Sequence, residues 1–245
     1  MYPLLELGPV RLSSGGLLLI IAVLIGTWLF ERHARQRGGE RLAELAGRCA
    51  SVALLGALVG ARLWYGMFSW DVYGRSPGLF LAFRIGDFAW PGALAGGALA
   101  GYLWCRHFGI SAVELADAAA LALPIAQVVA SIGLLLSGEA LGAPADLPWA
   151  VYLSGVARHP TQLYFAAAAL VSRALLAWGA RSAARPGMLT AFYLGFQGIA
   201  MLLIEALRVD SLVVAGGIRV AQVSGLLLLL AALWWQRSHV VAAPS

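Results

Sequence analysis

The sequence has 245 residues, of which 61% are hydrophobic and only 12% are charged, and its mean hydropathy is +0.81. A soluble domain carries about 25% charged residues, so this composition excludes an ordinary soluble protein. The net charge of +5 comes from arginine alone, and the arginines lie in short loops between apolar runs. Because that distribution is typical of membrane proteins and leaves no solvated basic face, we exclude nucleic-acid binding.

Apolar runs long enough to cross a bilayer recur along the whole chain. About 20 apolar residues span the hydrocarbon as a helix, which satisfies its backbone polar groups within the segment. The sequence therefore predicts an all-α polytopic membrane protein with roughly seven transmembrane helices, at about 14–30, 45–68, 90–104, 113–136, 161–178, a sixth ending near Arg208, and 220–235. We expect Pro124 to break the fourth helix. The start lacks a convincing signal-peptide cleavage site, so we expect the first helix to be retained.

The basic residues between these helices predict the orientation of the chain. Cytoplasmic loops of membrane proteins carry an excess of arginine. Alternate loops gather arginines on one side, within 32–41, at 106, at 181 and 185, and at 237. This bias places the N-terminus outside and the C-terminus in the cytoplasm. We expect residues 1–245 to form a single integral membrane domain with a polar outward loop at about 137–159.

Small residues line the predicted third helix. Two interleaved small-xxx-small patterns run through Gly92, Gly96, Gly97 and Gly101. Patterns of this kind let two helix backbones approach closely, so we expect tight packing here. Cys49 and Cys105 also lie in apolar segments, without metal-ligand spacing, and we interpret both as small buried residues.

Ionisable residues near membrane depth are costly, so each is a hypothesis for a functional site. The alternative for an arginine is snorkelling to the headgroups, which Arg62 fits poorly because it follows many apolar residues. Glu205 and Arg208 are three residues apart and share one helix face. They form either a local ion pair that makes burial tolerable, or a glutamate-oriented arginine that grips the phosphate of an anionic headgroup.

Two further polar segments adjoin helix ends. The hexapeptide 159–164 (HPTQLY) places His159 at a helix start, where backbone N–H groups favour phosphate and histidine could act as a general base. A capping histidine without a chemical role is the alternative. Residues 137–142 (SGEALG) form a polar, glycine-containing break after a span, although an ordinary loop would look the same. The predicted orientation gathers the ionisable residues of these segments toward the outer leaflet: Arg62, Glu139, His159, Glu205 and Arg208.

Taken together and in order, these segments resemble the prolipoprotein diacylglyceryl transferase family, and the resemblance covers nearly the whole chain. The hexapeptide 159–164 matches the family motif in full and is the most specific piece. The other matching pieces are LGPV at 7–10, GARL at 60–63, GGALAG at 96–101, SGE at 137–139 with Gly142, LPWA at 147–150, IEALR at 204–208 and AQVS at 221–224.

The resemblance implies a bacterial enzyme of the cytoplasmic (inner) membrane that transfers diacylglyceryl from phosphatidylglycerol to the lipobox cysteine of a preprolipoprotein. It implies no metal and no organic cofactor. The residues that it indicates for catalysis are Glu139 and His159, for proton handling or orientation, and Arg208, for phosphate. Those that it indicates for substrate binding are Arg62, Gly138, Gly142, Gln162, Tyr164 and Glu205.

Several polar positions of the family carry other residues here. Gly15-Gly16 replaces a tyrosine-glycine pair, and Pro91 stands where the family has a histidine. The signature's arginine and its two asparagines appear as Ser131, Leu134 and Ser137. Two alternatives therefore stand beside a diacylglyceryl transferase: a divergent paralogue that binds phospholipid or a lipidated partner without this chemistry, and a transferase with a different acceptor or lipid.

Overall fold

The computed structural model describes residues 4–7, 10–68, 70, 74, 78, 90–153, 155–181, 185–214 and 216–240. Within these residues, five helices are long and apolar enough to cross a membrane: Ser14–Met67, Ala112–Ser137, Thr161–Gly179, Met188–Leu207 and Val220–Arg237. The chain is therefore a mainly α-helical, multi-pass membrane protein, as its composition predicts. It divides into two compact units, one formed by Met1–His33 with Ala116–Ser245 and the other by Ala34–Leu115.

The first helix, α1 (Ser14–Phe68), combines the first two predicted spans. The predicted basic loop at 32–41 is instead largely helical, because its arginines and glutamates are good helix formers. The interruption is confined to Gly38 and Gly39, which have non-helical dihedral angles with φ of −142° and +73°. The positive φ at Gly39 suits a residue without a Cβ atom. Two helical segments thus meet at a glycine pair.

In the unit Ala34–Leu115, the second half of α1 packs against α3 (Trp90–His107) through glycines. A Cβ atom at Gly60 would lie 2.3 Å from the carbonyl oxygen of Gly92, and one at Gly96 would lie 2.2 Å from that of Gly56. The predicted close approach is confirmed. Cys49 and Cys105 are free and buried, as expected of small apolar residues.

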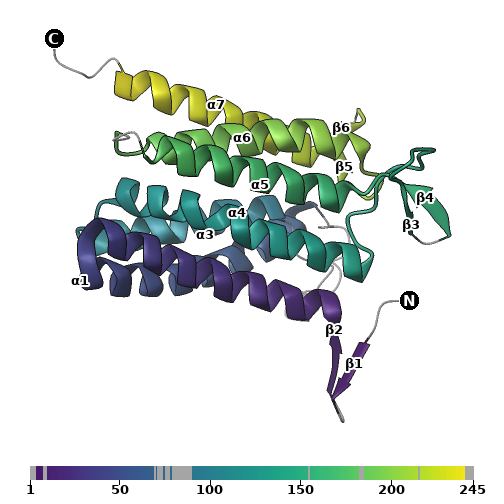
Figure 1. Cartoon of the computed structure of the whole chain (residues 1–245), viewed down its shortest axis with the longest axis horizontal. Helices are drawn as coiled ribbons and strands as arrows, with labels where there is room; N and C mark the ends of the chain where they lie inside the picture. The colour runs from purple at the N-terminus through teal and green to yellow at the C-terminus, as the bar shows by residue number, and fades with distance from the viewer. Residues whose placement is uncertain are drawn as a thin grey trace. The chain divides into compact units, whose positions relative to one another are not determined.

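In the other unit, α6 (Met188–Ile204) packs against both α5 (Thr161–Gly179) and α7 (Val220–Val240) (Figure 1). The backbones of α6 and α7 approach closely at Gly198 and Gly225. Helix α4 (Ala112–Ser137) continues through Pro124, so the predicted break at this proline is wrong. Helices in a bilayer tolerate proline where their surroundings satisfy the freed backbone groups.

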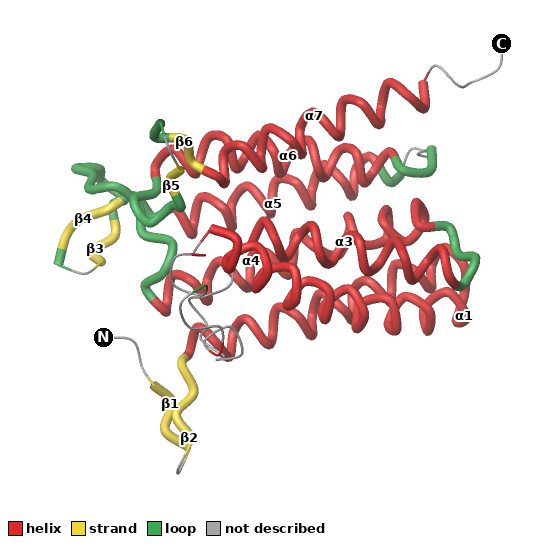
Figure 2. Tube along the Cα trace, turned by 180° about the vertical axis from the view of Figure 1, so that it is seen from behind, coloured by secondary structure: helices red, strands yellow, loops and turns green. Residues whose placement is uncertain are grey.

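Three short antiparallel hairpins among the described residues precede or connect the helices of this unit. Strands β1 (Leu4–Leu7) and β2 (Val10–Ser13) precede α1. Strands β3 (Val151–Leu153) and β4 (Val156–Arg158) lie inside the predicted polar loop. Strands β5 (Val213–Val214) and β6 (Ile218–Arg219) follow the 3-10 turn η3 (Glu205–Leu207) and lead into α7. Figure 2 shows β3 to β6 at one end of α5, α6 and α7.

Candidate functional site

The polar loop after α4 runs between two other segments of the chain. On one side, the N–H of Ala143 donates to the carbonyl of Leu207 (2.7 Å) and the N–H of Val209 to that of Leu141 (3.0 Å). On the other side, the N–H of His159 donates to the carbonyl of Ala143 (3.0 Å). The loop therefore positions the end of α6 and the start of α5 relative to each other.

Two residues with positive φ give the loop its path. Helix α4 ends in a Schellman motif, in which Gly138 (φ +71°) follows Ser137 and the N–H of Glu139 donates to the carbonyl of Leu134 (3.0 Å). Ala140 has φ +59°, and among the described residues it is the one non-glycine with positive φ. Such backbone strain costs about 1–3 kcal/mol and persists only where its surroundings hold it in place.

Side chains from the start of α5 hold this strained turn. The hydroxyl of Thr161 donates to the carbonyl of Ala140 (2.6 Å), and the Nε2 of Gln162 donates to the carbonyl of Glu139 (2.5 Å). Both side chains are almost fully buried. Two residues of the 159–164 hexapeptide thus act on the backbone of the loop.

Gly142 has no room for a side chain. A Cβ atom there would lie 2.1 Å from the carbonyl oxygen of His159. The close approach of the two backbones requires glycine at this position. Arg158 braces the same point, because its Nη1 donates to the carbonyl of Gly142 (3.0 Å).

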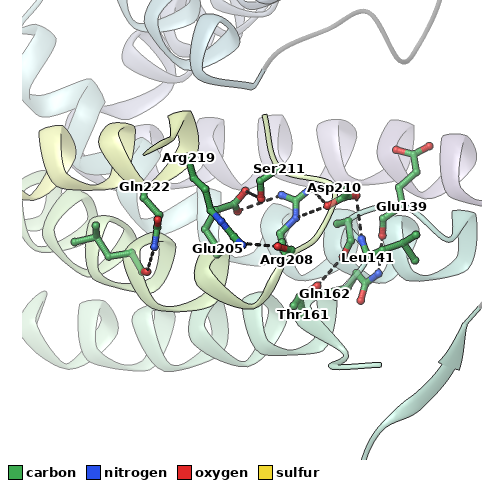
Figure 3. A network of polar contacts seen from close by, with 12 residues as sticks. Glu139, Leu141, Thr161, Gln162, Glu205, Arg208, Asp210, Ser211, Arg219 and Gln222 are labelled. Carbon is green, nitrogen blue, oxygen red and sulfur yellow. Dashed lines mark hydrogen bonds and ion pairs between the residues drawn. The ribbon is translucent and has the colours of Figure 1, made fainter. Parts of the chain in front are cut away.

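A network of charged side chains lies beside the loop (Figure 3). Nη1 of Arg208 contacts Oε2 of Glu205 at 3.2 Å, a contact that both interpretations of their spacing include. The predicted shared helix face is wrong, because Arg208 follows η3 in an extended conformation. Oε1 of Glu205 accepts a hydrogen bond from the hydroxyl of Ser211 (2.7 Å). The other edge of the guanidinium contacts Asp210, whose Oδ1 lies 3.0 Å from Nε and 2.8 Å from Nη2. Arg208 therefore lies between two carboxylates.

Arg219 closes the network from β6. Its Nη1 donates to the carbonyl oxygens of Glu205 and Arg208, the latter at 2.7 Å. The formal charges of the network cancel, because it contains two carboxylates, Glu205 and Asp210, and two guanidinium groups, Arg208 and Arg219. Since Glu205 is 2% exposed, its charge depends on these partners.

An aromatic chain leads from the loop to His159. Nε1 of Trp149 donates to the hydroxyl oxygen of Tyr164 (2.9 Å), and that oxygen lies 3.3 Å from Nδ1 of His159. Because the indole N–H only donates, it uses one lone pair of the Tyr164 oxygen, and the hydroxyl can still accept a hydrogen bond from Nδ1–H or donate one to unprotonated Nδ1. Nε2 of His159 can serve as a base only in the tautomer that carries its proton on Nδ1.

The predicted site residues fall into three groups. The structure brings Gly138, Gly142, His159, Gln162, Tyr164, Glu205 and Arg208 together around the loop. Glu139 contributes its backbone to this group, but its side chain is exposed and points away from Gln162 in Figure 3. Arg62 is buried in α1 of the other compact unit, and its part in the site stays a prediction.

Sequence reasoning did not identify Asp210, Thr161 and the backbone of Leu141 as members of the site. Asp210 lies two residues from Arg208, and that spacing was the available signal. The main-chain N–H of Leu141 donates to Oδ2 of Asp210 (3.0 Å). Almost every residue type has a main-chain N–H, so the identity of residue 141 could not indicate that its N–H takes part in the site.

Two of the positions where the chain departs from the motifs that it resembles, Gly15 and Ser131, are tightly packed or buried. A Cβ atom at Gly15 would lie 2.6 Å from the Cβ of Ser137 and 2.8 Å from the carbonyl oxygen of Gly133. The start of α1 thus contacts the end of α4 without space for a tyrosine side chain. Ser131 is buried within α4. Glycine at position 15 allows a closer contact between the two helices than a larger residue would.

Comparison with known proteins gives one consistent result. A family model described as prolipoprotein diacylglyceryl transferase matches residues 3–236. Proteins named phosphatidylglycerol–prolipoprotein diacylglyceryl transferase align over most of their length. The one from Clostridioides difficile is 32% identical over 86% of this chain and 84% of its own. Those from Trichormus variabilis and Gloeobacter violaceus are each 33% identical, over 95% and 97% of this chain and 88% and 96% of their own.

Proposed function

Because this chain belongs to the prolipoprotein diacylglyceryl transferase family, we propose that it transfers the diacylglyceryl group of phosphatidylglycerol to a prolipoprotein cysteine. The cysteine thiol loses its proton to a base, and the thiolate attacks the carbon of the diacylglyceryl group that is bonded to the phosphate oxygen. A C–S bond forms as the C–O bond breaks, and glycerol phosphate leaves with the bonding electron pair. The products are a diacylglyceryl thioether, glycerol phosphate and one proton.

The main support for this proposal is the position of the Arg208 guanidinium, which is held between the carboxylates of Glu205 and Asp210. Guanidinium presents two parallel N–H groups that match phosphate oxygens, and its charge counters the charge that develops on the leaving phosphate. Glu205 holds Nη1 at 3.2 Å, and the Nε and Nη2 edge, which contacts the partly exposed Asp210, is the edge to which we assign phosphate binding. On its motif alone, GARL at 60–63, we also propose Arg62 as a phosphate-binding residue.

Proton handling is assigned to His159 and Glu139. His159 is partly buried and is held by Tyr164, which suits a base of fixed orientation. Glu139 is exposed, so we give it the role of exchanging the proton with solvent or of orienting the acceptor peptide. Gly138, Gly142 and Gln162 shape the loop that brings these residues near Arg208.

We infer seven spans in the bacterial cytoplasmic membrane, with the N-terminus outside and the C-terminus inside. A continuous α-helix of 55 residues would be about 80 Å long, more than twice the hydrocarbon thickness, so α1 supplies two spans around Gly38–Gly39. Helices α3 to α7 supply the other five. This orientation puts the charged network at the outer surface, where exposed Trp149 and Tyr152 suit the headgroup region.

The proposal is tested with purified protein, phosphatidylglycerol and a lipobox peptide, by mass spectrometry of the peptide. We expect a diacylglyceryl mass gain from the wild type, and slower gain from Glu139→Ala, His159→Ala and Arg208→Ala. If Arg208→Ala and Glu139→Ala both left thioether formation unchanged, the assigned site would be wrong. Phosphatidylglycerol binding without any mass gain would favour the divergent paralogue instead, consistent with Leu134 and Ser137 at the family's asparagine positions.

A further inference from the structure

The carboxylate of Asp210 fills a cradle of three hydrogen-bond donors. Its Oδ1 accepts from Nε and Nη2 of Arg208, at 3.0 and 2.8 Å, and its Oδ2 accepts from the main-chain N–H of Leu141 at 3.0 Å. Two oxygens of a phosphate group present nearly the same spacing as the two oxygens of a carboxylate. Guanidinium and main-chain N–H groups are also the donors that commonly bind phosphate.

The three donors are held by contacts that do not involve Asp210. Arg208 is fixed by Glu205 at its Nη1 and by Arg219 at its carbonyl oxygen. The N–H of Leu141 follows Ala140, whose strained φ of +59° is held by the buried hydroxyl of Thr161. The strained backbone at Ala140 directs the next N–H toward the carboxylate that Arg208 also binds.

Asp210 itself is held less firmly than the cradle. Its side chain is 34% exposed, against 17% for Arg208 and 3% for Glu205. In the part of the chain that the structure describes, its carboxylate bonds only to the three donors. It lies in the short segment between η3 and β5, outside any helix or strand. Rotation of one exposed side chain would therefore free the cradle without disturbing the residues that form it.

We propose that the cradle binds the phosphate group of the substrate and of the leaving product, and that Asp210 is a built-in competitor for it. This inference rests on the proposed function for the identity of the lipid. A headgroup enters by displacing the carboxylate. After transfer, the carboxylate returns and helps to expel glycerol phosphate, whose extra negative charge would otherwise favour retention beside Arg208. The carboxylate thus weakens the binding of phosphate ligands and speeds the release of glycerol phosphate.

The test measures ligand binding without turnover. Wild type, Asp210→Ala and Asp210→Asn are placed in nanodiscs, and phosphatidylglycerol is titrated in while bound lipid is counted by native mass spectrometry. A second titration uses soluble sn-glycerol 1-phosphate, which separates a lipid headgroup from a free phosphate as the source of the anion. Diacylglycerol, which has no phosphate, is the reference ligand. Asp146→Asn is the matched control, because Asp146 is an exposed acid in the same loop region.

We expect Asp210→Ala to bind phosphatidylglycerol and glycerol phosphate about 2- to 5-fold more tightly, the range for loss of a partly exposed ion pair. Diacylglycerol binding should not change, and Asp146→Asn should match the wild type for all three. Asp210→Asn, which keeps the side-chain shape, should bind more tightly in the same direction even if the alanine variant folds poorly. Equal or weaker phosphate binding by a folded Asp210 variant would show that Asp210 is a structural partner of Arg208.

The outcomes separate this inference from the proposed function. If the wild type is active and its Asp210 variants bind phosphate ligands no more tightly, the transferase proposal stands and the role of Asp210 as a competitor is rejected. If the wild type transfers nothing but its Asp210 variants bind glycerol phosphate more tightly, the cradle is a phosphate-binding site and the transferase proposal is rejected.

Discussion

The two ends of helix α6 each hold a buried carboxylate, and the two are satisfied in different ways. At the start, Asp117 of α4 accepts hydrogen bonds from the main-chain N–H groups of Gly187 and Thr190, at 2.8 and 2.9 Å, and from the Thr190 hydroxyl at 2.7 Å. At the end, Glu205 contacts a guanidinium and a hydroxyl. Asp117 is 1% exposed and Glu205 is 2% exposed, so burial does not distinguish them.

The two ends of α6 differ in whether the partner of the buried carboxylate has a second, partly exposed edge to which a ligand can bind. Asp117 bonds to the first main-chain donors of α6, where a negative charge also complements the helix dipole. That arrangement fixes the position of a helix. Glu205 uses one edge of Arg208 and leaves the other edge facing Asp210, which is partly exposed. A buried carboxylate therefore indicates a candidate site only when its partner keeps a second face.

The largest effect is expected from Arg208→Ala. Loss of the guanidinium leaves Glu205 buried without its cation, which costs about 3–5 kcal/mol of stability. We also expect thioether transfer to fall at least about 100-fold, because the leaving phosphate loses a charged donor. Thermal unfolding in detergent and the transfer assay measure the two effects.

A double variant separates stability from chemistry at this end. Arg208→Ala with Glu205→Gln removes the uncompensated charge, so we expect most of the stability to return while transfer stays low. Recovery of transfer together with stability would show that Arg208 has only a structural role.

Asp117→Ala should have the next largest effect, on stability alone. It leaves the N–H groups of Gly187 and Thr190 without their acceptor, and loss of a buried cap of this kind costs about 2–3 kcal/mol. For the fraction that remains folded, KM for phosphatidylglycerol should not change. A selective rise in KM, with normal unfolding, would contradict the assignment of Asp117 to helix positioning.

Gly142→Ala tests the contact between the loop and the start of α5. The new Cβ would meet the carbonyl oxygen of His159 at 2.1 Å, so the two backbones must separate, at a cost of about 1–3 kcal/mol. Gly179→Ala is the matched control, because the nearest atom there lies 4.0 Å away. We expect transfer to fall in the first variant only. Equal activity of both variants would mean that the loop contact does not position the site.

The smallest effect is expected from Tyr164→Phe, which removes the hydroxyl between Trp149 and His159. One hydrogen bond is worth about 1 kcal/mol, so kcat/KM should fall about fivefold while folding is retained. Trp149→Phe should have a smaller effect, because His159 keeps its contact with Tyr164. An unchanged kcat/KM in Tyr164→Phe would remove the argument that His159 is oriented by this hydroxyl.

Contacts between residues that are close in sequence, and contacts between regular helices, could be predicted from the sequence, although Arg208 follows η3 in an extended conformation and not on a helix face. The spacing of Glu205 and Arg208 predicted their ion pair, and the glycines of α3 predicted its close contact with α1. The position of Asp210 could not be predicted in this way. Its second oxygen bonds to the main chain of Leu141, 69 residues earlier, through a loop whose path depends on a strained alanine.

The helix boundaries predicted from the sequence were wrong where the local residue composition opposed the expected pattern of spans and loops. The basic segment at 32–41 contains strong helix formers, so α1 extends beyond Phe30 as far as the glycine pair. Pro124 lies inside a continuous α4, because neighbouring groups can compensate for the missing N–H. The exposure of Glu139 depends on the Schellman turn at Gly138, which orients that side chain independently of its motif.

The central claim is that this altered family member still performs the transfer, and one measurement tests it directly. Purified wild type is incubated with phosphatidylglycerol and a lipobox peptide, and the peptide mass is recorded over time. We predict a mass gain of one diacylglyceryl group on the cysteine, with release of glycerol phosphate in equal amount. A folded protein that binds phosphatidylglycerol but leaves the peptide mass unchanged would contradict the account.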